Sequence, residues 1–193
     1  MYFSLLPLGT FLLFAPSLFK DLNAQQTSHS RELKRYFERG FERYLFASMR
    51  FGGPDSPKEC AYKLRSKLEE RNIGLVIIDV DIGDSITNAV FDGIEKCDGF
   101  VVFGTKSYGE DTGNPAATNK ELEFAENIGK KKILIKMIED DEDYKFLPAR
   151  ILFSGNKLHL YWGKGDRESK EVPSGLVCGI AKAANVGGGD GEP

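Results

Sequence analysis

Apolar runs and amphipathic stretches alternate along the chain from about residue 44 to residue 184. The apolar runs predict five strands, at Tyr44–Met49, Leu75–Val80, Gly99–Phe103, Lys132–Ile138 and Lys157–Trp162. Apolar residues at helical spacing predict helices over 57–71, 86–97, 118–128 and 174–184. Alternation at this spacing is typical of parallel strands joined by right-handed crossovers. The predicted fold is therefore α/β: a flavodoxin-like, doubly wound, parallel five-stranded sheet in three layers, with strand order 2-1-3-4-5.

Two of the predicted helices begin with the same signature. Ser56-Pro57-Lys58-Glu59 and Thr118-x-x-Glu121 each match a capping box, in which a hydroxyl and a carboxylate three residues later bond the backbone of the first turn. Proline at the first helical position strengthens the earlier of the two. Glu121 therefore has a purely structural explanation, as the second partner of a helix cap.

The ends of the chain differ from its middle. We divide it into an apolar extension (1–26), a lead-in helix (27–42), the main domain (43–186) and a tail (187–193) whose composition is typical of disorder. Residues 1–19 carry no charge, yet prolines interrupt them and no basic n-region precedes them, so they make a poor membrane span and a poor secretory signal. The expected location is cytoplasmic, with membrane association through residues 1–19 and packing of that segment on the domain as open alternatives.

Composition and charge exclude several classes of protein. The chain has 193 residues, 41% of them hydrophobic and 28% charged, as in a soluble globular protein. A net charge of −3 and the lack of a basic stripe disfavour nucleic-acid binding. Three widely spaced cysteines and two histidines offer neither a disulfide framework nor a zinc site, so no metal is expected.

Ligands of such folds bind beyond the carboxyl ends of the strands, so the loops there hold the candidate residues. These loops contain no Walker motif, no Gly-x-Gly-x-x-Gly, no paired acids of a phosphorelay receiver and no flavin phosphate loop. What remains is a group of polar and aromatic side chains near the ends of the first three strands and at the start of the helix before the fourth. Its members are Arg50, Phe51, the Asp79–Ile86 turn, Lys106, Ser107, Tyr108 and Glu121.

At these residues the chain resembles a Toll/interleukin receptor (TIR) domain, over about 44–184. The resemblance is carried by the first-strand stretch Leu45–Phe51, the Asp79–Ile86 turn, which matches the family's BB loop, and Asn119–Ala125, which matches its Trp-x-x-Glu-Leu helix. Two positions depart from the pattern: Thr118 stands where the family has tryptophan, and Met49 stands where it has an aromatic residue before the arginine.

The resemblance implies an enzyme that hydrolyses or cyclises NAD at the nicotinamide–ribose bond, in signalling or defence such as innate immunity. In catalytic members the helix glutamate drives this reaction, and Glu121 occupies its position. Nicotinamide leaves as a neutral molecule, so one carboxylate beside the oxocarbenium-like transition state suffices. Arg50, Phe51, Ser107 and Tyr108 are the expected substrate contacts. NAD is the substrate, and no separate cofactor is implied.

The resemblance also implies self-association, with a BB loop completing the pocket of a neighbouring copy. Asp81, Ile82, Gly83 and Asp84 are the expected interface residues. Two other interpretations stay open: a non-catalytic TIR adaptor that works through TIR–TIR contacts, and a nucleoside deoxyribosyltransferase-like enzyme, whose signature is not evident. An adaptor has no need of Glu121 near Arg50, and this separates it from the enzyme.

Overall fold

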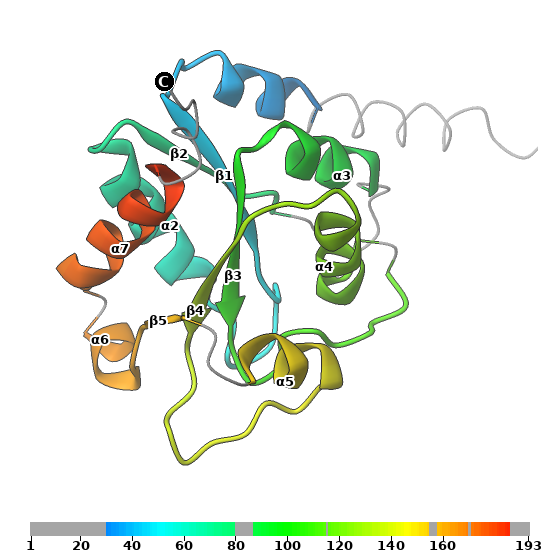
Figure 1. Ribbon diagram of the computed structural model, residues 1–193, viewed down its shortest axis with the longest axis vertical. Coiled ribbons are helices and arrows are strands. Elements are labelled where there is room, and N and C mark those ends of the chain that lie inside the picture. The colour runs from blue at the N-terminus through cyan, green and yellow to red at the C-terminus, as the bar shows by residue number, and fades with distance from the viewer. Residues whose placement is uncertain (1–29, 80–86, 115, 155–157, 170, 186–193) are drawn as a thin grey trace, which may run out of the picture.

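A computed structural model of the chain describes residues 30–79, 87–114, 116–154, 158–169 and 171–185 (Figure 1). Its centre is a five-stranded sheet whose neighbouring strands all pair in parallel, in the order β2-β1-β3-β4-β5. The strands are β1 (Arg43–Ser48), β2 (Ile73–Val76), β3 (Gly99–Gly104), β4 (Lys132–Lys136) and β5 (Leu160–Tyr161). This confirms the predicted flavodoxin-like fold.

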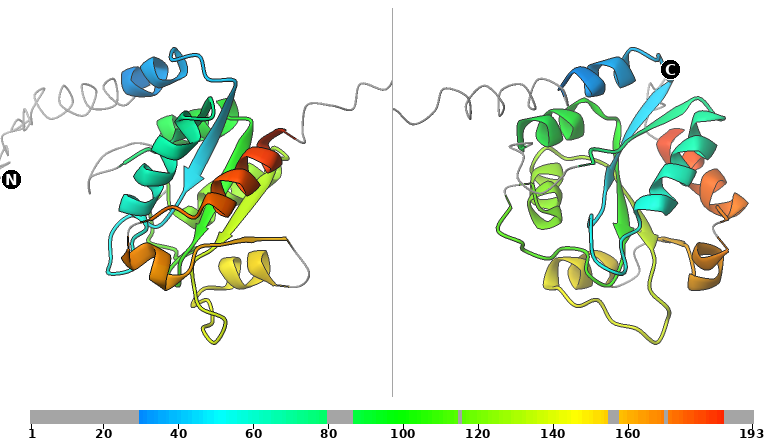
Figure 2. Two further views of the ribbon diagram at one scale, coloured as in Figure 1. Left: turned by 90° about the vertical axis from the view of Figure 1, so that its left-hand side faces the viewer. Right: turned by 180° about the vertical axis from the view of Figure 1, so that it is seen from behind.

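Helices cover both faces of the sheet, which makes the three layers. One face carries α2 (Lys58–Glu69) and α7 (Ser174–Asn185), and the other carries α3 (Thr87–Lys96) and α4 (Thr118–Asn127), as Figure 2 shows. Two short helices, α5 (Leu147–Phe153) and α6 (Lys164–Glu168), flank β5 in the chain and were not predicted. Helices of seven and five residues are too short for a helical hydrophobic period to stand out.

Neighbouring residues of each central strand point into different cores. On β1, Leu45 packs in the core under α2 and α7, and Phe46 packs in the core under α3 and α4. Both side chains are 1% exposed. A strand that buries both faces needs an apolar residue at almost every position, which explains the continuous apolar runs in the sequence.

Strand β2 begins two residues earlier than predicted. Ile73 and Gly74 pair with Arg43 and Tyr44 of β1, and the strand ends at Val76. A Cβ at position 74 would lie 2.7 Å from the Phe41 ring, so this pairing needs a glycine there. The prediction placed the strand at Leu75 because the continuous apolar run begins there, after the glycine.

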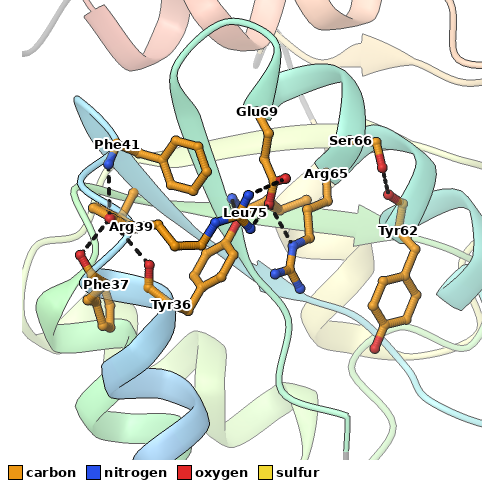
Figure 3. Close-up of polar contacts among 10 residues, drawn as sticks. Tyr36, Phe37, Arg39, Phe41, Tyr62, Arg65, Ser66, Glu69 and Leu75 are labelled. Atoms are coloured by element: carbon orange, nitrogen blue, oxygen red, sulfur yellow. Dashed lines mark hydrogen bonds and ion pairs between the residues drawn. The ribbon is translucent and has the colours of Figure 1, made fainter.

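Residues 30–37 form a helix that packs on the edge of the domain beside β2 and α2. Glu69 of α2 joins this segment to the domain, because it accepts hydrogen bonds from Tyr36 (2.9 Å), Arg39 (2.8 and 3.0 Å) and Arg65 (3.0 Å) (Figure 3). Burial alone would raise the pKa of Glu69, but these hydrogen bonds outweigh it and hold the pKa below its ordinary value. The carboxylate therefore stays charged at neutral pH and ties the lead-in helix to the body of the protein.

The expectation of a membrane-associated location is corrected by the structure. Among the helices of the described residues, none is both long and apolar enough to cross a membrane. The apolar run 1–19, on which that expectation rested, lies outside the described residues, as do the tail 187–193 and the BB-loop residues 80–86.

Candidate functional site

A pocket of about 490 Å³ opens at the carboxyl ends of β1 and β3. It lies between the loop that follows β1 and the loop that leads into α4, and its lining includes Arg50, Phe51, Glu110, Thr118 and Glu121. β1 is the strand at which the connections change direction, since the chain passes from β1 to β2 on one side and returns to β3 on the other. Ligands of doubly wound sheets bind at this kind of switch point.

Glu121 lies in the first turn of α4 and is only 6% exposed. The N-cap of α4 is Ala117, and no side chain forms a hydrogen bond to the cap. Thr118, the expected capping residue, instead uses its hydroxyl oxygen to accept a hydrogen bond from the Gly109 amide at 3.0 Å. The capping explanation of Glu121 is therefore wrong, and its carboxyl group is directed to other partners.

Those partners form a buried chain of three polar groups. The Ser48 hydroxyl donates a hydrogen bond to Glu121 Oε2 at 2.5 Å and lies 2.9 Å from the Tyr108 hydroxyl. Ser48 and Tyr108 have no exposed surface. Side chains from the end of β1, the loop after β3 and the start of α4 thus meet at one point, which fixes the orientation of the Glu121 carboxyl.

Burial is the main electrostatic influence on this group. It raises the pKa of Glu121 from its ordinary value of 4.5 to about 8, against the lowering effect of the Ser48 hydrogen bond. Burial also raises the pKa of Tyr108, and the neighbouring Glu121 adds to this, so the phenol stays neutral. Near neutral pH this environment therefore favours a protonated carboxyl group, which a nearby positive charge would help to ionise.

Arg50 and Phe51 lie in the same pocket as Glu121. The Arg50 guanidinium donates from Nε to Glu110 at 3.0 Å and from Nη1 to the Phe51 carbonyl at 2.7 Å. The Arg50 and Glu110 side chains are 31% and 32% exposed. Arg50, the cation in the described lining of this pocket, thus already has an anionic neighbour at the rim.

The structure places the remaining expected contacts elsewhere. Tyr108 lies behind Glu121, where it contacts Ser48 and is absent from the pocket lining. Ser107 donates its amide and hydroxyl to Asp55, at 3.1 and 2.8 Å, and lines a different hollow. Asp81, Ile82, Gly83 and Asp84 lie outside the described residues.

Sequence reasoning missed Ser48, the residue that holds Glu121. The available signal was a single polar residue within the apolar first strand, at its carboxyl end. A hydroxyl that is fully buried between two strands needs a hydrogen-bond partner, and a strand-end position puts that partner at the ligand-binding edge.

A metal centre is not apparent in the part of the chain that the structure describes. No group of three or more histidine, cysteine, aspartate or glutamate side chains in those ranges is arranged to hold an ion.

The comparisons with known proteins are sparse. No protein-family model matches the chain, so the TIR resemblance stays a prediction, and no curated protein matches either. One solved structure similar to this chain is the CMP N-glycosidase BcmB of Clostridium botulinum, at a TM-score of 0.40 and 22% identity. The match covers 66% of this chain and 96% of that one. A likeness of this degree does not bear on activity, so the functional argument rests on the pocket.

Proposed function

We propose that the protein is an N-glycosyl hydrolase that cleaves NAD between nicotinamide and ribose, with Glu121 as the catalytic carboxylate. The observation that carries this proposal is the buried, titratable Glu121 carboxyl, which lines a pocket at the switch point of the sheet and is held by Ser48. Pockets of a few hundred Å³ with a few convergent polar groups are of the size that binds small molecules and cofactors.

One carboxylate is enough for this reaction. When the bond between nicotinamide and C1′ of ribose breaks, the bonding electrons go to the ring nitrogen, so the cationic ring leaves as neutral nicotinamide. Positive charge develops on the ribose, and the Glu121 carboxylate stabilises it. Water then adds to C1′ and loses a proton, which gives ADP-ribose. Glu110, the other acid in the described lining, is paired with Arg50, and the reaction does not need it.

The raised pKa of Glu121 favours a cationic substrate. Burial favours the protonated carboxyl, and a bound pyridinium ring would favour the ionised form that the reaction needs. The same observation favours a second candidate, a nucleotide N-glycosidase. There the base is uncharged and leaves only with a proton, which protonated Glu121 could donate.

Arg50 supports recognition of the diphosphate of NAD. Its ion pair with Glu110 is about one-third exposed. Exposed pairs of this kind contribute about 0–1 kcal/mol. If a phosphate oxygen takes the place of Glu110 beside Arg50, one ion pair replaces another, and the change in free energy is small.

The test is nicotinamide release from NAD by the purified full chain, followed over a range of protein concentrations because the family resemblance implies self-association. Glu121→Gln should lower the rate by roughly 10²-fold, the usual effect of removing one preorganised electrostatic partner. Glu123→Gln is the matched control, since Glu123 lies on the same helix with a 62% exposed side chain that pairs with Lys120. Its rate should stay within about twofold of wild type.

Each outcome separates the alternatives. Equal release by wild type and Glu121→Gln would remove Glu121 from the mechanism. No release from NAD, together with base release from CMP, would favour the nucleotide N-glycosidase. No release from either compound at any protein concentration would favour the adaptor.

A further inference from the structure

A second hollow, of about 800 Å³, opens at the same edge of the sheet but on the α2 face. Its lining comes from the start of α2, the residues directly after β3 and β4, and α6. Figure 2 shows α6 beside the beginning of α2. The Glu121 pocket uses other parts of the same two loops, so the two hollows are neighbours and share no lining residue.

Three residues that line this hollow carry buried polar atoms that have no hydrogen-bond partner among the residues that the structure describes. They are Thr105, through its hydroxyl Oγ1, Ser56, through its hydroxyl Oγ, and Arg167, through Nε. Thr105 is 1% exposed. An unpaired buried polar group costs stability, and a folded protein normally leaves few of them. Three in the lining of one hollow indicate a ligand that would complete them.

The start of α2 adds further hydrogen-bond donors. The N-cap of this 12-residue helix is Pro57, and no side chain forms a hydrogen bond to the cap. Ser56, the residue predicted to cap it, is one of the three with an unpaired atom. The Ser56 hydroxyl therefore does not cap α2 as the sequence predicts, and the positive end of the helix dipole faces the hollow.

Charged side chains of both signs surround these donors: the lining holds Lys58, Lys106, Lys145, Lys164 and Arg167 together with Asp55, Glu59, Glu142 and Glu168. Lys106 pairs with Glu142 at 3.3 Å and Lys164 pairs with Glu168 at 3.7 Å, and all four side chains lie on the rim of the hollow. Their side chains are 38% to 68% exposed. Exposed pairs of this kind are weak, so a multiply charged anion can replace the glutamates as the partner of the two lysine ammonium groups. Arg167 adds a guanidinium at the same rim.

We propose that this hollow is a phosphate-binding site, for inorganic phosphate or for the phosphate of a nucleotide. The Thr105 and Ser56 hydroxyls donate to phosphate oxygens, the first-turn amides of α2 face the anion, and Arg167 with the rim lysines neutralises its charge. Phosphate fits because its oxygens accept several hydrogen bonds at once, and the Thr105 hydroxyl, the Ser56 hydroxyl and Arg167 Nε can each donate one. The proposal does not depend on the reaction assigned to Glu121.

The test measures binding of inorganic phosphate and of ADP to the full chain by calorimetry, at ionic strength matched with sodium chloride. Thr105→Val keeps the shape of the side chain and removes the unpaired hydroxyl. Without phosphate this variant should melt about 2–4 °C higher than wild type, and its phosphate affinity should fall by about tenfold. Ser56→Ala should also weaken phosphate binding. Affinity for ADP well above that for phosphate identifies the ligand as a nucleotide if Thr105→Val lowers it, because Arg50 in the Glu121 pocket is itself an expected diphosphate contact. Equal affinities for ADP and phosphate identify free phosphate.

Ser66→Ala is the matched control for Ser56→Ala, because Ser66 lies on α2 outside the described lining of the hollow and its hydroxyl donates to the Tyr62 carbonyl at 3.2 Å. It should bind phosphate as wild type does. The proposal is overturned if wild type binds no phosphate at millimolar concentration, or if Thr105→Val binds phosphate as tightly as wild type. A melting temperature of Thr105→Val below that of wild type would also overturn it, because it would mean that the hydroxyl has a partner.

Discussion

The starts of α2 and α4 carry the same capping signature, and neither helix uses it. At α4, Thr118 bonds the Gly109 amide, and the Glu121 carboxyl bonds Ser48 inside the protein. At α2, the Ser56 hydroxyl has no partner. Both helices begin with a residue whose side chain does not cap, Ala117 and Pro57.

The two helix starts differ in the partners of the polar side chains that were predicted to cap and do not. Around Glu121 the polar groups satisfy one another through Ser48 and Tyr108, so the acid is rigidly placed and its pKa is raised. Around Ser56 and Thr105 the polar groups stay unpaired. An acid whose hydrogen bonds are formed within the protein is suited to catalysis, because its orientation is fixed before a ligand binds. Unpaired donors suit binding, since a ligand completes them.

The largest expected effect concerns the pH dependence of stability at α4. The pKa of Glu121 is raised from its ordinary value of 4.5, which applies to the unfolded chain, to about 8 in the folded protein. Between these two pH values the folded protein keeps the proton of this carboxyl group, whereas the unfolded chain has lost it. The contribution of the protonated group is complete below about pH 4.5 and is lost as the pH rises towards 8, by up to about 1.4 kcal/mol per pH unit. Glu121→Gln should remove this slope, so that its free energy of unfolding exceeds that of wild type increasingly towards pH 8. Urea unfolding from pH 5 to pH 9 measures it, and parallel curves for the two proteins would contradict the burial argument.

A smaller effect is expected when the chain of three polar groups is cut. Ser48→Ala leaves both Glu121 and Tyr108 without their shared partner and should lower the free energy of unfolding by about 1–3 kcal/mol. It should also raise the pKa of Glu121 further, because the Ser48 hydrogen bond lowers it. Tyr108→Phe keeps the Ser48–Glu121 bond and should cost about 1 kcal/mol. Equal losses in the two variants would show that Ser48 does not join the two groups.

The smallest effects come from the caps themselves. Ala117→Ser supplies a hydroxyl at the extended N-cap position of α4 and should stabilise the protein by about 0.5–1 kcal/mol. Ser56→Ala removes a hydroxyl that caps nothing, so the free energy of unfolding should not fall by more than about 0.3 kcal/mol. A loss near the ~1 kcal/mol of a capping serine would show that the predicted cap at α2 forms after all.

The fold could be predicted because its evidence is local. Each central strand is an apolar run, and alternation with amphipathic stretches indicates a doubly wound sheet. The errors also have local causes: Gly74 precedes the apolar run in the sequence but pairs with Tyr44 in β2, and β5 is a strand of only two residues, within the predicted run Lys157–Trp162. Where such a strand begins and ends depends on its pairing with a neighbouring strand, and this pairing is not visible in the sequence.

The site could be predicted in part, for a different reason. Arg50, Phe51 and Glu121 come together because the carboxyl ends of parallel strands meet at one edge. The partner of Glu121 was missed, since Ser48 and Glu121 are 73 residues apart and the capping signature offered a local explanation of Glu121. The capping signatures were misleading because a cap requires only nearby residues, whereas the observed bonds of Thr118 and Glu121 depend on the loop before α4 and the end of β1.

The most direct measurement of the catalytic claim is the pH profile of kcat/KM for NAD cleavage between pH 6 and pH 9.5. If the ionised Glu121 carboxylate stabilises the developing charge, kcat/KM should rise about tenfold per pH unit and level off above the pKa of the free enzyme, about 8. Glu121→Gln should show a rate lower by roughly 10²-fold and no such rise. A wild-type rate that is flat across this range, or that falls as the pH passes 8, would contradict the carboxylate mechanism.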